Sequence, residues 1–217
     1  NSLGEMKYKV IGAGSNLLVR DQGYDGILLK LGKNFNFIKI HNSLLEVGAG
    51  ILDVNLAKFA KINKIKGFEF YAGIPGTIGG AIKMNSGCYG NETKKILKDI
   101  TVINSSKIVN IIQKDKINLS YRNSNLLSRD IITSARFNYS YGNEEEIINT
   151  INNIKTMRKN SQPIKIKTSG STFKNPVNNY AAKLIEMAGC KGLNVNDAFV
   201  SHKHSNFLIN TNKASAK

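Results

Sequence analysis

The sequence predicts an α+β fold in which short strands outnumber helices. Strand-sized apolar runs rich in Ile, Leu and Val fill roughly the first 140 residues. Two segments instead place their apolar residues at helical spacing, one near residue 57 and one near residue 151. With 217 residues, of which 41% are hydrophobic, the chain can bury a core as one domain or two small ones.

The first half of the chain reads as strands interrupted by one helix. Residues 51–63 form the helix, because their apolar side chains fall mostly on one face and Lys58 and Lys61 lie outside it. The strands before and after it are predicted at residues 7–11, 16–19, 26–31, 35–40, 44–47, 100–104, 108–112 and 131–139.

The second half contains two helices and one strand. Acidic residues open the helix at 144–158 and Lys155, Arg158 and Lys159 close it, as the helix dipole favours, before Pro163 breaks it. A Gly/Ser turn at 169–171, a helix at 180–188 ending at Gly189 and a strand at 206–210 follow.

The chain is strongly basic, as nucleic-acid-binding proteins are. Lys plus Arg is 31 and Asp plus Glu is 15, so the formal net charge is +16. However, 26 of these cations are lysines scattered along the chain, and Asn and Ile are equally abundant. Such a compositional drift explains the charge without a polyanionic partner, so we expect no nucleic acid and keep a basic nucleic-acid-binding module only as an alternative.

Neither a disulfide framework nor a metal site is expected. The chain has two cysteines, Cys88 and Cys190, no CxxC pair and three scattered histidines, which is compatible with a reducing cytoplasm. No apolar run approaches the ~20 residues of a membrane span, and no signal peptide opens the sequence at Asn1. We therefore expect a cytoplasmic protein that is not inserted in a membrane.

A first glycine loop, Gly12-Ala13-Gly14-Ser15-Asn16, follows the first predicted strand. It does not fit the dinucleotide fingerprint, which needs a third glycine and must open a helix, because residues 17–19 read as another strand. Successive backbone N–H groups in such a loop can bind phosphate, but a tight hairpin explains the pattern equally well.

A second glycine loop, AGIPGTIGGAIKMNSGCYG at residues 72–90, is more specific. Pro75 suits the first turn of a short helix that offers free N–H donors, while Gly79 and Gly80 allow close approach to another backbone or a flat ligand. A plain glycine-rich turn is the alternative. Two such loops about 60 residues apart fit a pyrophosphate-bearing dinucleotide that spans a cleft.

Five motifs occur in order: GAGSNLLV at 12–19, the 72–90 run, YRNS at 121–124, SGSTFKNP at 169–176 and KHSNFLIN at 203–210. Together they resemble the UDP-N-acetylenolpyruvoylglucosamine reductase family, flavoenzymes of bacterial peptidoglycan synthesis. The glycine loops alone resemble the wider vanillyl-alcohol-oxidase-type (PCMH-type) FAD domains, whereas YRNS and SGSTFKNP single out the reductase. The compact spacing between Tyr121 and Ser171 is similar to the family's shorter type.

The resemblance implies a definite architecture and set of partners. A PCMH-type FAD-binding domain would occupy residues 1–142, a connecting helix 143–163, and a small, incomplete α+β substrate-binding domain 164–217. The implied reaction is the NADPH-dependent reduction of UDP-N-acetylglucosamine enolpyruvate to UDP-N-acetylmuramate by a monomer with bound FAD.

The resemblance also assigns site residues. Arg122 matches the active-site arginine, and Ser171 matches the serine that donates a proton. The substrate would contact Tyr121, Arg158, Lys174, Asn175, His204 and Asn206. FAD would be held by the two loops and one asparagine, namely Gly12, Ala13, Gly14, Ser15, Asn16, Leu17, Gly73, Ile74, Pro75, Gly76, Thr77, Gly79, Gly80 and Asn85.

The chain departs from the family pattern at both ends. The family has a further N-terminal lobe, whereas only seven residues precede the first predicted loop strand here, and the family's C-terminal catalytic glutamate has no counterpart after Asn210. We therefore expect an excerpt of a complete enzyme or the product of a shortened gene, which by itself holds FAD weakly and turns over little.

The implied chemistry agrees with the residue types. Hydride addition to an enolpyruvyl double bond leaves negative charge delocalised toward the carboxylate, which suits the planar guanidinium of Arg122. The hydroxyl of Ser171 can protonate a strongly basic carbanion. A surface ion pair and a turn serine are the alternatives for these two residues. For the whole chain, the alternatives are an inactive relic that at most binds FAD and an oxygen-using sugar or lactone oxidase on the same scaffold.

Overall fold

The computed structural model describes residues 7–217 and has the α+β class that the sequence predicts. The chain divides into two units, Asn1–Gly14 with Asp25–Lys155, and Ser15–Tyr24 with Thr156–Lys217. The second division point lies inside the long helix α3 (Glu144–Ser161), within the range predicted to connect two domains. The domain limits themselves stay a prediction.

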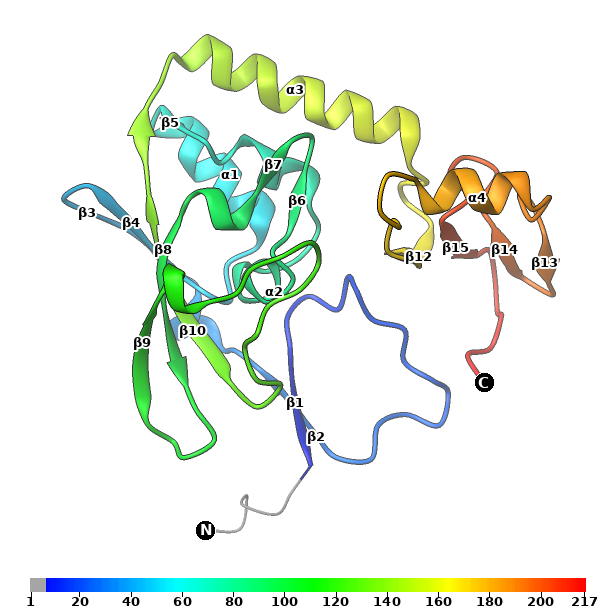
Figure 1. Cartoon of the computed structure of the whole chain (residues 1–217), viewed down its shortest axis with the longest axis horizontal. Coiled ribbons are helices and arrows are strands. Elements are labelled where there is room, and N and C mark those ends of the chain that lie inside the picture. Colours follow the sequence, from blue (N-terminus) through cyan, green and yellow to red (C-terminus); the bar gives the residue numbers. More distant parts are fainter. Residues whose placement is uncertain (1–6) are drawn as a thin grey trace. The chain divides into compact units, whose positions relative to one another are not determined.

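A five-stranded antiparallel sheet forms the centre of the first unit (Figure 1). Phe137 pairs with Leu45, and both are fully buried on one face of the sheet. The neighbouring pair, Arg136 and Glu46, points to the other face because side chains alternate along a strand. The strand order is β3 (Ile38–His41), β4 (Leu44–Gly48), β10 (Ile131–Asn138), β8 (Leu97–Ile103) and β9 (Val109–Gln113).

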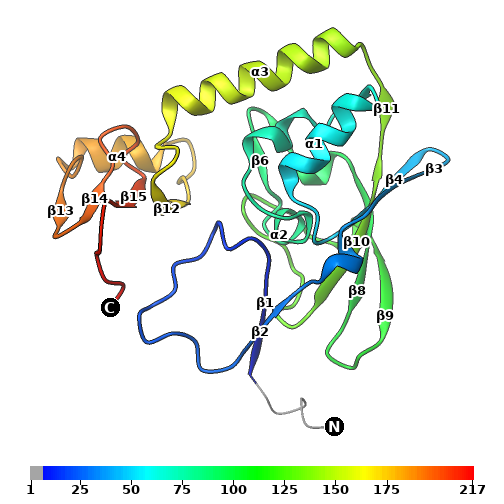
Figure 2. The same ribbon diagram turned by 180° about the vertical axis from the view of Figure 1, so that it is seen from behind.

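Two helices, α1 (Asp53–Ile62) and α2 (Ile78–Lys83), lie on one side of this sheet, as the views from front and back agree (Figures 1 and 2). Four aromatic side chains of the core of this unit are fully buried. The Phe68 and Phe137 rings lie edge to face with their centres 5.8 Å apart, and the Phe70 and Tyr71 rings stack with their centres 4.2 Å apart. Single-turn 3₁₀ helices occur at Lys33–Phe35, Glu69–Gly73, Thr93–Lys95 and Lys114–Lys116.

Short strand pairs complete the first unit. The strands β1 and β2 run parallel, with Val10 opposite Leu29, and the other two pairs are antiparallel and two residues long. The pairs are β1 (Tyr8–Ile11) with β2 (Ile27–Lys30), β5 (Ile65–Lys66) with β11 (Ser140–Tyr141), and β6 (Gly87–Cys88) with β7 (Asn91–Glu92).

Helix α3 begins where its sequence predicts. Asn143 is its cap, because its Oδ1 accepts hydrogen bonds from the N–H groups of Glu145 (2.8 Å) and Glu146 (3.1 Å). Ile147, Ile151 and Ile154 recur at helical spacing and are buried. None of the helices within residues 7–217 is long and apolar enough to cross a membrane.

The second unit contains the end of α3, a four-stranded antiparallel sheet and the helix α4 (Ala181–Met187). Its buried apolar side chains include Phe207 on β15 and Ala181 at the start of α4. The strand order is β12 (Lys167–Ser171), β15 (Phe207–Asn210), β14 (Ala198–Val200) and β13 (Asn194–Val195).

Three local predictions are wrong. The strand predicted at 16–19 does not form, because Leu17, Leu18 and Val19 are exposed and pair with no strand of the described chain. The short helix after Pro75 begins only at Ile78, because Thr77 is still extended and forms a bridge with Leu52. The turn predicted at 169–171 belongs to β12, where a shift in register accommodates Gly170 at a φ of +88°.

The remaining long elements are confirmed with shifts at their ends. The strand predicted from residue 35 begins at Ile38, because Phe35 is in a 3₁₀ turn. The helices predicted at 51–63, 144–158 and 180–188 are α1, α3 and α4.

Candidate functional site

A cavity of about 150 Å³ lies in the first unit where the second glycine loop meets the sheet. Its walls come from four places: the ends of β1 and β2, the residues after β4, helix α2 and the segment before β10. The lining residues include Gly12, Lys30, Gly50, Thr77, Gly79, Gly80, Lys83 and Asp130. A larger open hollow of about 510 Å³ lies elsewhere in this unit, between β5, β11 and α3, away from both glycine loops.

The two glycine loops predicted from the sequence meet at this cavity. A Cβ atom on Gly12 would lie 2.3 Å from Oγ1 of Thr77, so only glycine permits the contact. Thr77 is the N-cap of α2, and its Oγ1 accepts a hydrogen bond from the N–H of Gly80 at 3.4 Å. Residues 65 positions apart therefore form one wall.

The other glycines of the second loop serve different purposes. Gly79 lies against Ala49, where an added Cβ would come within 3.2 Å of another Cβ, as predicted for a helix that approaches a backbone closely. Gly73 is buried against Ile154, 2.8 Å from an added Cβ, and Ile74 packs against the core. Gly76 accepts a hydrogen bond from the N–H of Asp53 at 3.1 Å and has a φ of +154°.

Arg122 lies in a strained turn beside the end of the second glycine loop. Its φ is +53°, a left-handed conformation that is uncommon outside glycine and that eight other non-glycine residues of the described chain share. Its Nη2 donates a hydrogen bond to the carbonyl of Gly87 at 3.0 Å, and its guanidinium lies 5.4 Å from the centre of the Tyr121 ring. The planar cation is thus held by a backbone contact from the loop itself.

Asn85 is buried and its amide is bonded to the protein. Nδ2 donates to Glu92 Oε2 (2.8 Å) and to the carbonyl of Ser120 (3.3 Å), and Oδ1 accepts from the N–H of Lys94 (3.0 Å). Asn85 therefore joins the glycine loop to the start of the Arg122 turn. Its predicted contact with a cofactor stays a prediction.

Lys83 is not among the residues predicted from the sequence. It is the one charged residue of α2 (Ile78–Lys83), and it lines the cavity. It is half-buried, and burial lowers its pKa while the carboxylate of Asp130 acts in the opposite direction. One sequence signal could have found it: residues 72–91 contain a single charged side chain, and it is Lys83.

Asp53, the first residue of α1, carries a buried carboxyl group. Its side chain is 1% exposed, and neither carboxyl oxygen has a hydrogen-bond partner among residues 7–217. Burial raises the pKa of Asp53 to about 8, so its protonated form is favoured at neutral pH. The acid packs near Tyr71, whose pKa is also raised, first by burial and second by the charge of Asp53.

Ser171 is exposed at the end of β12 in the second unit. The residues after it are held by Asn206: the N–H of Thr172 donates to the Asn206 carbonyl (2.8 Å), and the Asn206 amide bonds both the N–H (2.9 Å) and the carbonyl (2.8 Å) of Phe173. Asn206 is only 3% exposed. It therefore fixes the Ser171 loop, and its predicted contact with the substrate stays a prediction.

The other predicted residues of the second unit lie around this loop. Lys174 and Asn175 are exposed, and Asn175 Oδ1 accepts a hydrogen bond from Ala181 N–H at 3.0 Å at the start of α4. His204 packs its ring on Phe207 at 4.7 Å, and burial lowers its pKa, which favours the neutral imidazole. Arg158 is half-buried near the end of α3.

The structure thus gathers the predicted residues into two groups. Gly12, Thr77, Gly79 and Gly80 line the cavity, and Arg122 is bonded to the same glycine loop. Ser171, Asn206 and His204 share the second unit, to which Ser15, Asn16 and Leu17 also belong. Ala13, Gly14, Pro75 and Tyr121 are exposed.

Two sequence profiles match the chain. The profile described as an FAD binding domain matches residues 4–109, which include both glycine loops. The profile described as the UDP-N-acetylenolpyruvoylglucosamine reductase C-terminal domain matches residues 162–217, which include Ser171 and Asn206.

Relatives and a solved structure agree with these profiles. The chain is 43% identical to a UDP-N-acetylenolpyruvoylglucosamine reductase of Rickettsia conorii over 213 residues, which are 98% of this chain and 72% of the relative. The Rickettsia bellii reductase is 44% identical over 207 residues, 95% of this chain and 68% of the relative. The crystal structure of UDP-N-acetylenolpyruvylglucosamine reductase from Thermus caldophilus superposes with a TM-score of 0.90 at 35% identity, covering 98% of this chain and 77% of that one. The chain belongs to the UDP-N-acetylenolpyruvoylglucosamine reductase family.

Proposed function

We propose that this chain reduces UDP-N-acetylglucosamine enolpyruvate to UDP-N-acetylmuramate with FAD as bound cofactor and NADPH as reductant. The single observation that carries the proposal is the cavity at α2. There two glycine loops converge, and the strained Arg122 turn is bonded to the same loop through Gly87. Membership of the reductase family supports the choice of substrate.

The residues of the cavity fit a dinucleotide. Gly12, Gly79 and Gly80 line it without side chains, so a pyrophosphate can approach their backbone closely. Lys30 contributes positive charge to the same wall, which favours an anionic ligand. These residues would hold the FAD phosphates. Bound there, FAD would supply the hydride chemistry, which protein side chains cannot perform.

Arg122 would stabilise the charge that develops on the substrate. Hydride addition at the β carbon of the enolpyruvyl group places negative charge on the α carbon and its carboxylate. A guanidinium is planar and always cationic, and it can donate two parallel hydrogen bonds to a carboxylate. The bond from Nη2 to Gly87 fixes the orientation of the fork before substrate arrives, which is the condition for electrostatic catalysis.

Ser171 would hold the proton that completes the reduction. Its Oγ would donate that proton to the α carbon, because a developing carbanion is a far stronger base than a serine alkoxide. The loop after Ser171 is bound at three points by Asn206, so the hydroxyl is presented by a fixed backbone. His204, favoured in its neutral form, and the exposed Lys174 would contact the substrate.

Two measurements test the proposal. The visible spectrum of the protein reconstituted with FAD should show bound flavin, and NADPH should be consumed only when the enolpyruvyl sugar is present. Absence of bound flavin would exclude every flavoenzyme hypothesis. Flavin that is reoxidised by oxygen and not by the sugar would indicate an oxidase instead. We further propose a monomer that acts in the cytoplasm, where nicotinamide and nucleotide-sugar pools are found.

Gly12→Ala is expected to weaken FAD binding by about 5- to 150-fold, because overpacking a filled contact costs about 1–3 kcal/mol. The added Cβ meets Thr77 Oγ1 at 2.3 Å, and either the loop or the α2 cap must move. Flavin fluorescence titration measures the dissociation constant. Gly32→Ala is the matched control, because a Cβ there has no neighbour within 4 Å in the described part of the chain. The double variant Gly12→Ala/Thr77→Ala should recover part of the affinity; no recovery would mean that the clash is not the cause.

A further inference from the structure

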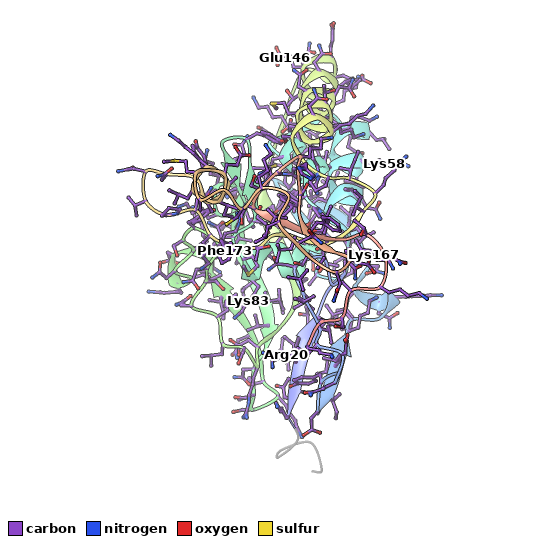
Figure 3. The ribbon with its side chains drawn as sticks, turned by 90° about the vertical axis from the view of Figure 1, so that its right-hand side faces the viewer. Arg20, Lys58, Lys83, Glu146, Lys167 and Phe173 are labelled. Carbon is purple, nitrogen blue, oxygen red and sulfur yellow. The ribbon has the colours of Figure 1, made fainter. Side chains whose placement is uncertain are left out.

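Lys83 lies at a junction between the cofactor cavity and the Arg122 turn. It is the last residue of α2, whose first turn carries Gly79 and Gly80, and it lines the same cavity as they do. Figure 3 labels Lys83 together with Lys58, which lies on α1 with an exposed side chain. The proposed reaction assigns Lys83 no contact with the cofactor or the substrate.

Both ends of Lys83 bind the segment that follows Arg122. The ammonium Nζ donates hydrogen bonds to the carbonyl oxygens of Leu126 and of Leu127, the second at 3.2 Å. The backbone carbonyl of Lys83 accepts a hydrogen bond from Ser124 Oγ at 2.8 Å. Three bonds from one residue thus hold a segment that lies more than 40 positions away in the sequence.

The segment from 121 to 130 is also held by side chains at other positions: Asn125 bonds the N–H of Asn118 (2.9 Å) and the carbonyl of Lys116 (3.4 Å), and the Tyr8 hydroxyl donates to the carbonyl of Arg129 (2.9 Å). It contains no helix, and its pairing is a single bridge between Ser120 and Asn123. Within it, the N–H of Leu127 donates to Asp130 Oδ2 (3.0 Å) and the N–H of Asp130 donates to the Leu127 carbonyl (3.2 Å). The Leu127 carbonyl is therefore shared between this turn and the ammonium of Lys83.

We propose that Lys83 is a positioning residue whose three hydrogen bonds tie the Arg122 loop to the cofactor helix α2. As a consequence, the position of the arginine that would bind the substrate is coupled to the position of the helix whose glycines would bind the cofactor. A methionine cannot replace it, because it has no donor, whereas an arginine can donate to both carbonyl oxygens. The catalytic part of this proposal rests on the proposed function, but the structural part does not.

Hydrogen exchange of the chain without cofactor tests the structural part. In Lys83→Met, the amides of Leu127 and Asp130 should exchange about 10- to 100-fold faster, as expected for loss of charge-assisted bonds. Lys83→Arg should keep the slow exchange, and Ser124→Ala should show a smaller increase. Amides of β10 serve as the check that the variants are folded. Unchanged loop exchange in a folded Lys83→Met protein would overturn the proposal, and so would an equal increase in the control Lys58→Met.

Kinetics of the full-length gene product test the catalytic part. Lys83→Met should lower kcat/KM for the enolpyruvyl sugar about tenfold or more, while flavin reduction by NADPH changes less than about twofold. In an Arg122→Lys background the same substitution should have little further effect, because Lys83 acts through Arg122. If the two losses multiply, the positioning role is wrong. If the protein binds no flavin but the loop amides of Lys83→Met still exchange faster, the proposed function is wrong. The structural role of Lys83 is then retained.

Discussion

Ser171→Ala is expected to slow reoxidation of the reduced flavin by the enolpyruvyl sugar by about 10²- to 10⁴-fold, the usual contribution of a general acid. Reduction of the flavin by NADPH should stay within about twofold of the wild type, because no proton from Ser171 is needed in that half-reaction. The substitution leaves the loop in place, since Thr172 and Phe173 are bonded to Asn206 through their backbone.

Stopped-flow measurement of flavin absorbance separates the two half-reactions in the full-length gene product. Ser105→Ala, at an exposed position in a turn of the first unit, is the matched control and should leave both rates unchanged. Equal slowing of both half-reactions by Ser171→Ala would contradict the assignment. Ser171 would then position the nicotinamide or the flavin rather than donate a proton.

Asp53→Asn is expected to stabilise the fold at pH 7 by up to about 4 kcal/mol. Burial raises the pKa of Asp53 from 3.8 to about 8, so the folded state keeps its proton at pH 7 while the unfolded state has lost it. Each pH unit between these values therefore costs about 1.4 kcal/mol of stability. Asparagine fills the same space and carries no charge in either state.

The stability difference between Asp53→Asn and the wild type should depend on pH. Below about pH 4 both states of the wild type are protonated, so the variant and the wild type should unfold at nearly the same denaturant concentration. The difference should grow as the pH rises toward 8 and then level off. Chemical denaturation at pH 4, 6 and 8 measures it. Asp115→Asn, an exposed carboxyl on the same unit, is the control. A difference independent of pH would mean that Asp53 is ionised in the folded protein.

The long elements could be predicted from sequence because their signals are local. The α3 helix needs only its own residues: Asn143 caps it, and isoleucines recur at 147, 151 and 154 to form the buried face. The strand β4 likewise alternates less buried and buried residues from Leu44 to Val47, and β10 is a continuous stretch of mostly buried residues. In each case the pattern of the apolar residues is a property of a continuous stretch.

The wrong and missing elements depend on partners that are distant in the sequence. Leu17, Leu18 and Val19 have the composition of a strand, but a strand exists only where another strand accepts its hydrogen bonds. The two-residue strands β5 and β11 exist only because Tyr141 pairs with Ile65 across the first unit. No pattern within two residues can reveal such a pair.

The residues of the candidate site likewise fall into those that the sequence predicts and those that depend on distant contacts. The glycine loops could be predicted, because glycine density is visible in the sequence and the meeting of Gly12 with Thr77 requires it. The contact of Asn206 with Phe173 spans 33 residues, and the contact of Lys83 with Leu127 spans 44. Motif resemblance assigns such residues to a ligand, whereas the structure shows that Asn206 first serves the protein's own backbone.

The walls of the α2 cavity have a consequence for biosynthesis. They are contributed by residues from Val10 to Ile132, so the ribosome must release well over half of the chain before the cavity can close. Joining such distant segments costs loop-closure entropy before any contact compensates for it. The cavity can therefore bind a cofactor only after the residues up to Ile132 have been synthesised. The supply of flavin in the cell would then set the fraction of newly made molecules that reaches a protease-resistant state. The reason is that a ligand stabilises only the form that binds it.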